Sequence, residues 1–170
     1  MQTSVLTTDY ANEPRQRRLK PVKSPKVART RTGLGVFARQ RYQESQIIGE
    51  IEGEVIDDLD YSSRYCMDLG DTRCLEPIAP FRFVNHSCTP NCAFEWFDVR
   101  CPQGGEPERK LFLSALETIE SGEQLTIDYC WPPAMAIRCR CGETECRGWI
   151  VAKSQLPELE ALQLQAARAG

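Results

Sequence analysis

The chain has 170 residues, of which 41% are hydrophobic and 26% charged, and its formal net charge at pH 7 is -3. These values indicate a globular chain long enough for one domain with a sizeable core. The sequence has no apolar stretch of transmembrane length and no secretory signal with a basic start and an apolar middle, so we expect an intracellular protein without a membrane partner.

Positive charge is concentrated near the start of the chain. No acidic residue lies between Glu13 and Glu44, an interval with ten Lys and Arg residues, whereas 22 acidic residues oppose 11 basic ones from Glu44 onward. Prolines and the lack of hydrophobic periodicity predict a flexible basic leader over 1–26. The acidic body attracts a basic partner, and the leader either makes a weak nucleic-acid contact, folds back on the body or stays solvated.

Short strand patterns begin near residue 27. Gly33, Leu34 and Gly35 separate strands expected at 29–31 and 36–38, so they predict a tight glycine turn between two strands. Glycines would also let the backbone come close to a ligand, although an ordinary hairpin turn explains them equally simply.

Residues 47–56 alternate apolar and acidic side chains, which is the period of a strand whose glutamates face water or a cationic partner. Further short strands are expected at 65–69, 73–77, 93–97, 110–116 and 124–129. Many short strands and few helical windows predict a mainly β domain. One helix is expected at the end of the chain, where Leu156, Leu159 and Leu162 repeat at helical spacing, and it most simply packs on the body.

The stretch 82–92 holds the only histidine, His86, and two of the nine cysteines. Its Arg, Asn, His and Ser side chains are too polar for a core strand and supply many hydrogen-bond donors. The stretch is therefore a polar ligand-binding turn, half of a metal site completed elsewhere, or a structural turn with a hydrogen-bonded histidine.

The cysteines favour thiols and metal over disulfides, because they crowd late in the chain and no export signal is present. Cys139, Cys141 and Cys146 place three thiols in eight residues. Zinc takes four such ligands in a tetrahedron, so a fourth must come from a distant segment, and Cys88 and Cys92 are the natural donors. The alternative is a set of unrelated reduced cysteines. A shared zinc would hold the C-terminal segment over whatever the stretch 82–92 binds.

Four motifs then occur in order, at 33–37, at 82–92, at 122–129 and in the C-x-C-x4-C run that closes on 146–148. Together they resemble the SET-domain protein-lysine methyltransferases with a post-SET zinc tail, over about 27–151. The resemblance implies a mainly β, SET-domain (β-clip-like) fold of small curved sheets with a pseudoknot and a short C-terminal helix. It divides the chain into a leader (1–26), a SET domain (27–130), a post-SET zinc segment (131–151) and a C-terminal helix (152–170).

The same resemblance implies an S-adenosylmethionine-dependent protein-lysine N-methyltransferase with Tyr129 at the reaction centre. The residues implied in cofactor binding are Gly33, Leu34, Gly35, Tyr65, Arg82, Asn85, His86, Tyr129 and Trp149. The implied ligands of one zinc ion are Cys88, Cys139, Cys141 and Cys146. The implied substrate is a histone tail or another basic protein, and the implied location is nuclear in a eukaryote and cytoplasmic in a bacterium.

The chain departs from the family pattern at two positions. The family's E-Y-x-G-E motif places a tyrosine in the lysine channel, whereas this chain has Ile51, which cannot donate a hydrogen bond. The aromatic position two residues before the catalytic tyrosine is Ile127, which we expect to favour higher methylation states. The cysteine-rich pre-SET region is absent from this sequence, so we expect a single zinc ion.

Two other functions fit the same residues. Ile51 is compatible with a SET module that binds cofactor and peptide but transfers a methyl group weakly or not at all. A zinc-stabilised interaction protein without any cofactor is the second alternative.

Overall fold

A computed structural model describes residues 23–69, 72–100 and 104–169, so the predicted leader lies almost entirely outside the described residues. The elements in chain order are β1 (Lys26–Thr30), β2 (Gly33–Phe37), β3 (Ile47–Glu50), β4 (Gly53–Ile56), β5 (Met67–Asp68), β6 (Cys74–Pro77), η1 (Phe81–Phe83), β7 (Asn85–His86), β8 (Cys92–Val99), β9 (Glu108–Ala115), β10 (Gln124–Ile127), η2 (Pro133–Met135), η3 (Lys153–Gln155) and α1 (Leu156–Ala169). The predicted mainly β fold with a short C-terminal helix is confirmed.

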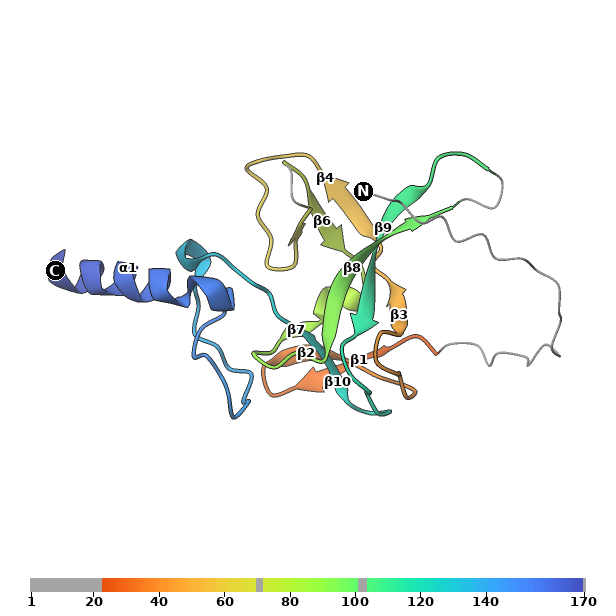
Figure 1. Ribbon diagram of the computed structural model, residues 1–170, viewed down its shortest axis with the longest axis horizontal. Coiled ribbons are helices and arrows are strands. Elements are labelled where there is room, and N and C mark those ends of the chain that lie inside the picture. Colours follow the sequence, from red (N-terminus) through yellow and green to blue (C-terminus); the bar gives the residue numbers. More distant parts are fainter. Residues whose placement is uncertain (1–22, 70–71, 101–103, 170) are drawn as a thin grey trace, which may run out of the picture.

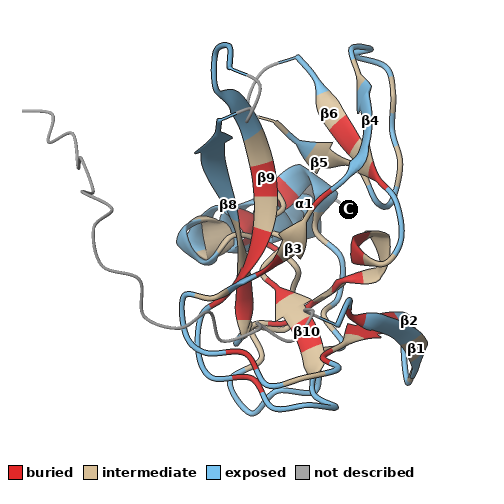
Figure 2. Ribbon diagram, turned by 90° about the vertical axis from the view of Figure 1, so that its right-hand side faces the viewer, coloured by how far each residue is buried: buried red, intermediate tan, exposed pale blue. Residues whose placement is uncertain are grey.

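The strands form three small sheets (Figure 1). One four-stranded sheet has the order β1-β2-β10-β7, and two three-stranded sheets have the orders β3-β9-β8 and β4-β6-β5. Buried side chains lie along β9 and β10, near the middle of the molecule (Figure 2). The largest of the fully buried apolar side chains are Tyr42, Leu113, Ile119, Leu125, Val36 and Val151.

The short strand β7 lies at the edge of the four-stranded sheet and runs parallel to β10. A parallel pair needs a long crossover connection, and here that connection includes β8 and β9. The pairing brings the polar stretch 82–92 beside the segment that leads to Tyr129, as a pseudoknot requires. The threading itself stays a prediction.

The β1–β2 hairpin turns at Arg31 and Thr32, so the predicted position of the glycine turn was wrong. Thr30 pairs with Gly33 and Ala28 pairs with Gly35, which places the glycines inside β2. Gly33 has a φ of +132°, a conformation that favours glycine, and it starts the strand directly after a two-residue turn.

The single strand predicted over 47–56 is divided between two sheets. β3 pairs with β9, and β4 pairs with β6. At the junction Ile51 is buried, and a Cβ on Gly53 would overlap the backbone of Glu76, so the chain can cross closely only with glycine there. The expectation that the glutamates face water or a cationic partner is confirmed, because Glu52 and Glu54 are exposed and Glu50 pairs with Lys110 at 2.9 Å.

The helix α1 projects away from the sheets (Figure 1) and contacts η2 and η3. Leu159 is its only buried residue between 156 and 168, whereas Leu162 and Leu164 are exposed. The expected packing on the body was therefore wrong, because the helix projects away from the sheets and docks on η2 and η3. Among the described residues no helix is long and apolar enough to cross a membrane.

Candidate functional site

A cavity of about 190 Å³ lies between the β1–β2 hairpin and the segment that leads into β7. Its lining residues are Thr32, Gly33, Leu34, Arg64, Tyr65, Arg82, Phe83, Val84, Asn85 and Tyr129. Six of the nine predicted cofactor residues are therefore brought together: Gly33, Leu34, Tyr65, Arg82, Asn85 and Tyr129. A larger groove of about 470 Å³ lies between β4 and β9, but its described lining residues include none of the nine.

Asn85 and His86 project to opposite sides of β7, as successive strand residues do. The Asn85 side chain lines the cavity, where its Nδ2 donates a hydrogen bond to the Leu34 carbonyl at 2.8 Å. Gly35 leaves room for this contact, because a Cβ there would lie only 3.1 Å from Asn85 Nδ2. Gly35 is not among the residues that line the cavity, and its role in cofactor binding stays a prediction.

His86 was expected to bind the cofactor, but its side chain is buried behind β7 and is absent from the cavity wall. Its Nδ1 accepts a hydrogen bond from the Tyr129 backbone N–H at 3.3 Å, and its Nε2 lies 3.5 Å from Cys88 Sγ. An accepting Nδ1 places the proton on Nε2, facing that sulfur. Burial lowers the pKa of His86, which favours this neutral form. His86 thus joins Tyr129 to the cysteine cluster.

Tyr129 follows β10 and reaches the cavity from behind β7. Its hydroxyl donates a hydrogen bond to the Val84 carbonyl at 2.9 Å. Burial raises the pKa of Tyr129 to about 12, because a phenolate is poorly solvated there. The phenol therefore stays neutral near pH 7 and acts through its hydrogen bonds and not as a base.

One wall of the cavity is a stack of charged and aromatic groups. The guanidinium of Arg82 lies 4.0 Å from the centre of the Tyr65 ring, and the Tyr65 ring meets Phe83 edge to face at 6.1 Å. Arg82 Nη1 also donates to Glu76 Oε1 at 2.6 Å. Sequence reasoning missed Glu76, whose only signal is an acidic residue on a short strand six residues before Arg82.

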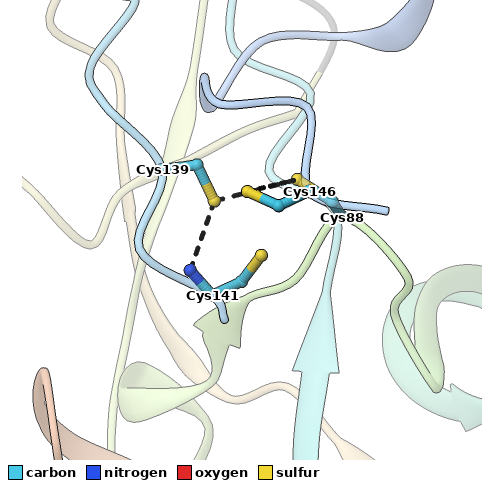
Figure 3. Close-up of side chains that lie close together, drawn as sticks. All are labelled: Cys88, Cys139, Cys141 and Cys146. Atoms are coloured by element: carbon cyan, nitrogen blue, oxygen red, sulfur yellow. Dashed lines mark hydrogen bonds between the residues drawn. The ribbon is translucent and has the colours of Figure 1, made fainter. Parts of the chain in front are cut away.

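A second cluster joins two segments that are distant in sequence. The Sγ atoms of Cys88, Cys139, Cys141 and Cys146 all lie within 4.8 Å of one another (Figure 3). Four sulfurs around a tetrahedral zinc ion, each about 2.3 Å from it, are about 3.8 Å apart. The Cys88 sulfur lies 3.7 Å from that of Cys139 and 4.0 Å from that of Cys146, so the cluster can hold one zinc ion.

The protonation of these thiols agrees with a cation site. Burial raises the pKa of Cys88 and of Cys139, so their thiolates need a nearby positive charge. Burial acts in the same direction on Cys141, but hydrogen bonds from backbone N–H groups lower its pKa to about 7. The backbone N–H of Arg147 also donates to Cys88 Sγ at 3.4 Å.

Cys92 was the other natural donor for the fourth position, and the structure excludes it. It begins β8 with 1% of its surface exposed, and its sulfur contacts Asn91 Oδ1 at 3.4 Å. Burial raises the pKa of Cys92 to about 12, as expected for a core thiol. The two cysteines are four residues apart, and only Cys88 lies before the chain turns into the sheet.

Polar contacts outside the cluster also tie the C-terminal segment to the body. Asp128 receives two hydrogen bonds from the Arg147 guanidinium, at 2.6 and 2.8 Å. Burial acts to raise the pKa of Asp128, but the hydrogen bonds from Arg147 and from the Cys130 backbone N–H, together with the charge of Arg147, lower this pKa overall. Arg31 Nη2 donates to the Arg140 carbonyl at 2.7 Å. Sequence reasoning missed the Asp128–Arg147 pair, although Asp128 directly precedes Tyr129 and Arg147 directly follows Cys146.

Trp149 was expected to cover the adenine, but it does not line the cavity. Arg138 and Trp149 form an antiparallel bridge within the C-terminal segment, which places the guanidinium 4.0 Å from the centre of the indole. Ile51 and Ile127 are the two residues that differ from the family pattern. Both are 5% exposed and belong to the core against which Tyr129 packs.

Comparisons with known proteins agree with this geometry. The SET domain family model matches residues 33–130. The histone-lysine N-methyltransferase ash1 of Drosophila melanogaster is 32% identical over 150 residues, which cover 76% of this chain and 6% of that protein. The histone-lysine N-methyltransferase ASHR3 of Arabidopsis thaliana is 30% identical over 154 residues, which cover 79% of this chain and 29% of that protein.

Among solved structures, the chain is similar to KRYPTONITE in complex with mCHH DNA, an H3(1-15) peptide and SAH. The TM-score is 0.61 with 21% identity, over 74% of this chain and 29% of that one. At this identity the likeness shows a shared fold. The chain spans less than a third of the length of each of these relatives.

Proposed function

The chain belongs to the SET domain family, and from this premise we propose that it is an S-adenosylmethionine-dependent protein-lysine N-methyltransferase. The observation that carries the proposal is the position of Tyr129, whose ring lines the same cavity as Asn85 while its backbone is linked through His86 to the cysteine cluster. The cofactor supplies a methyl group on a positively charged sulfur.

The reacting nucleophile is the substrate lysine amine. Its reference pKa is about 10.4, so it must lose a proton before it can attack. Burial in a channel and the nearby positive sulfur both lower that pKa. When bound, the cofactor would supply its methyl group to the deprotonated amine and would leave as the neutral thioether, while the methylated nitrogen would release its extra proton to water.

The residues of this chain act on that step by positioning. The Tyr129 hydroxyl donates its proton to the Val84 carbonyl at 2.9 Å, so both oxygens have lone pairs left to accept from the N–H groups of the amine and orient it. Alignment of nitrogen, carbon and sulfur is worth several kcal/mol, about 7–11 in well-oriented systems. Asn85 holds the hairpin backbone at Leu34, which shapes the cavity for the cofactor.

We assign Cys88, Cys139, Cys141 and Cys146 as ligands of one zinc ion. The cluster satisfies the spacing of a tetrahedral site, and the Asp128–Arg147 pair fixes the C-terminal segment beside it. Zinc binding therefore supports the site without taking part in the transfer.

The substrate is a basic protein tail, with histones the first choice because the similar proteins named above are histone-lysine methyltransferases. The excess of acid over base from Glu44 onward attracts such a tail. In a eukaryotic cell this assigns the protein to the nucleus. Weak nucleic-acid contact through the basic leader is part of the same proposal.

The test is transfer of radiolabelled methyl groups to histones and to a cell lysate, with Tyr129→Phe as the matched variant. Loss of one hydrogen bond to a charged reacting group, about 1.5–3 kcal/mol, should lower kcat roughly tenfold to a hundredfold. S-adenosylhomocysteine affinity, measured by calorimetry, should change less than about twofold.

Ile51 supports one competing function, a module that binds cofactor and peptide without transfer, because a buried isoleucine offers no hydroxyl to the channel. Binding of S-adenosylhomocysteine without label transfer to any lysate protein would favour that module. Absence of both binding and transfer would favour a zinc-stabilised interaction protein.

A further inference from the structure

Four exposed arginines come together from two segments that are distant in sequence: Arg29, Arg31, Arg138 and Arg140. Arg29 lies on β1 and Arg31 in the turn after it, whereas Arg138 and Arg140 flank Cys139 of the cysteine cluster. The Arg31 guanidinium donates to the Arg140 carbonyl at 2.7 Å, and Figure 1 shows the blue C-terminal loop beside the orange β1–β2 hairpin. The four residues therefore follow one another along the surface, and we call them the basic row.

The charge of the basic row is held in place without being neutralised. Arg31 is fixed by a backbone carbonyl, and the Arg138 guanidinium lies 4.0 Å from the centre of the Trp149 ring. A guanidinium has five N–H donors, so these neutral partners leave donors and the full charge for a ligand. Among the described residues no member of the row forms an ion pair. By contrast, a carboxylate pairs with each of three other arginines: Arg41, Arg82 and Arg147.

The acidic residues near the basic row leave its charge uncompensated. On the β1 side, the sequence has no acid between Glu13 and Glu44. On the C-terminal side, Glu143 Oε1 accepts a hydrogen bond from Ser87 Oγ at 3.1 Å, and within the described chain neither Glu143 nor Glu145 pairs with an arginine of the row. A chain with a formal net charge of -3 thus has one positive surface, which favours an anionic partner.

We propose that the basic row binds the phosphate backbone of double-stranded DNA. Alternate residues of an extended segment are about 6.6 Å apart, so the row is too long for one small anion and fits a series of regularly spaced charges. Arginine also matches phosphate with two parallel hydrogen bonds. A single strand would need an aromatic face for its bases, and the indole beside the row is already occupied by Arg138. This surface belongs to the folded chain and is separate from any contact of the leader, and the inference does not depend on methyl transfer.

The experiment is fluorescence anisotropy of a short labelled DNA duplex, titrated with the zinc-loaded full chain at salt concentrations between about 50 and 200 mM. The variant is Arg29→Gln/Arg140→Gln. The control Arg39→Gln/Arg100→Gln makes the same charge change at two exposed arginines, one beyond the end of β2 away from the hairpin turn and one after β8. Each phosphate contact contributes about 0.9 to the slope of log K against log salt concentration. The variant should therefore lower this slope by about 1.8 and weaken binding about fivefold to twentyfold at about 50 mM salt, and the control should keep the slope and stay within about twofold in affinity.

Two further variants separate charge from folding. Arg29→Gln alone changes a residue on β1 outside the cysteine cluster, and it should lower the slope by about 0.9. Arg29→Lys/Arg140→Lys keeps both charges and should keep most of the slope. Because phosphate contacts carry no base information, two duplexes of unrelated sequence should bind within about twofold of each other.

An unchanged slope in Arg29→Gln/Arg140→Gln would overturn the inference, since any DNA contact would then belong to other residues. An equal loss in the control would overturn it too, because net charge alone would then explain binding. Tighter binding of single-stranded RNA or of poly-glutamate at the same salt concentration would assign the row to another class of partner. Failure of the wild-type chain to bind the duplex at about 50 mM salt would also contradict the proposal. Methyl transfer is measured separately, so each of these outcomes leaves the proposed function intact.

Discussion

At the scale of single residues, the alternation of side-chain direction along β7 decides which side chain faces the cavity. Asn85 faces the cavity, and His86 faces the cysteine cluster. The only histidine is therefore committed to two structural contacts and is buried, so it supplies no general base to the cavity. Under the proposed function, the substrate lysine would lose its proton to water, and the pH dependence of the reaction would report the pKa of that amine.

This assignment makes a prediction about pH. The pKa of Tyr129 is raised to about 12, so its neutral, hydrogen-bonding form persists throughout the working range. The logarithm of kcat/KM should rise with pH at a slope near one until the substrate lysine is deprotonated, toward its reference pKa of about 10.4. Initial rates of methyl transfer between pH 7 and about pH 10 check this. A falling limb in the wild type that is missing from Tyr129→Phe would contradict it.

A second prediction concerns the number of methyl groups added. Ile127 is 5% exposed and presents no hydroxyl to the core around Tyr129. No ring hydroxyl is then available to hold the methylated amine out of alignment, so dimethyl and trimethyl products should accumulate. Mass spectrometry of a methylated peptide checks the distribution, with Ile127→Val as a control that keeps it. A spectrum with monomethyl product alone would refute the hypothesis.

Residue roles were predictable where a motif fixes both identity and register. The four cysteine ligands and Asn85 followed from their spacing and from the family resemblance. The cofactor roles of His86 and Trp149 stay predictions. Strand pairing turns the His86 side chain behind β7, and a bridge to Arg138 positions Trp149 within the C-terminal segment. Glu76 carries no motif, and only its distance to Arg82 reveals the contact.

At the scale of elements, the C-terminal segment is held to the body by β10. Asp128, directly after β10, forms a bidentate pair with Arg147 in which the side chains are 21% and 10% exposed. Because both side chains are largely buried, removal of the Asp128 carboxylate would leave the Arg147 guanidinium without its partner. The Asp128–Arg147 pair at the end of β10 therefore contributes to the stability of the fold as well as to the position of Tyr129.

Asp128→Asn should lower the free energy of unfolding by about 2–3 kcal/mol, because it leaves a largely buried guanidinium unpaired. The matched control is Glu120→Gln, which breaks the pair with Arg41 where both side chains are 58% exposed. That control should cost no more than about 0.5 kcal/mol. Urea unfolding of the zinc-loaded variants measures both values, and equal losses would contradict the account.

Strand existence was predictable from alternation, but strand partners were not. Strand structure within 47–56 was predicted correctly, although Ile47 and Val55 are exposed. The close crossing at Gly53 assigns the two halves to different sheets, through contacts with Glu76 that no local pattern contains. The glycines of β2 were assigned to a turn because composition does not distinguish a turn from a strand that must pass close to Asn85. The C-terminal helix was predicted correctly, but Leu162 and Leu164 on it are exposed.

At the scale of the whole molecule, two segments separated by about fifty residues share one cluster of thiols. His86 links that cluster to Tyr129, and Arg147 links it to the end of β10. Under the proposed function, we therefore expect zinc binding, the position of the C-terminal segment and the shape of the cavity to be coupled.

The most direct measurement is the zinc content of purified protein by native mass spectrometry. We predict one zinc ion per chain in the wild type and in Cys92→Ala, whose thiol lies in the core outside the cluster. Cys88→Ser and Cys146→Ser should each lose the ion and weaken S-adenosylhomocysteine binding by at least about tenfold. Retention of a full complement of zinc by Cys88→Ser, or its loss from Cys92→Ala, would contradict the account.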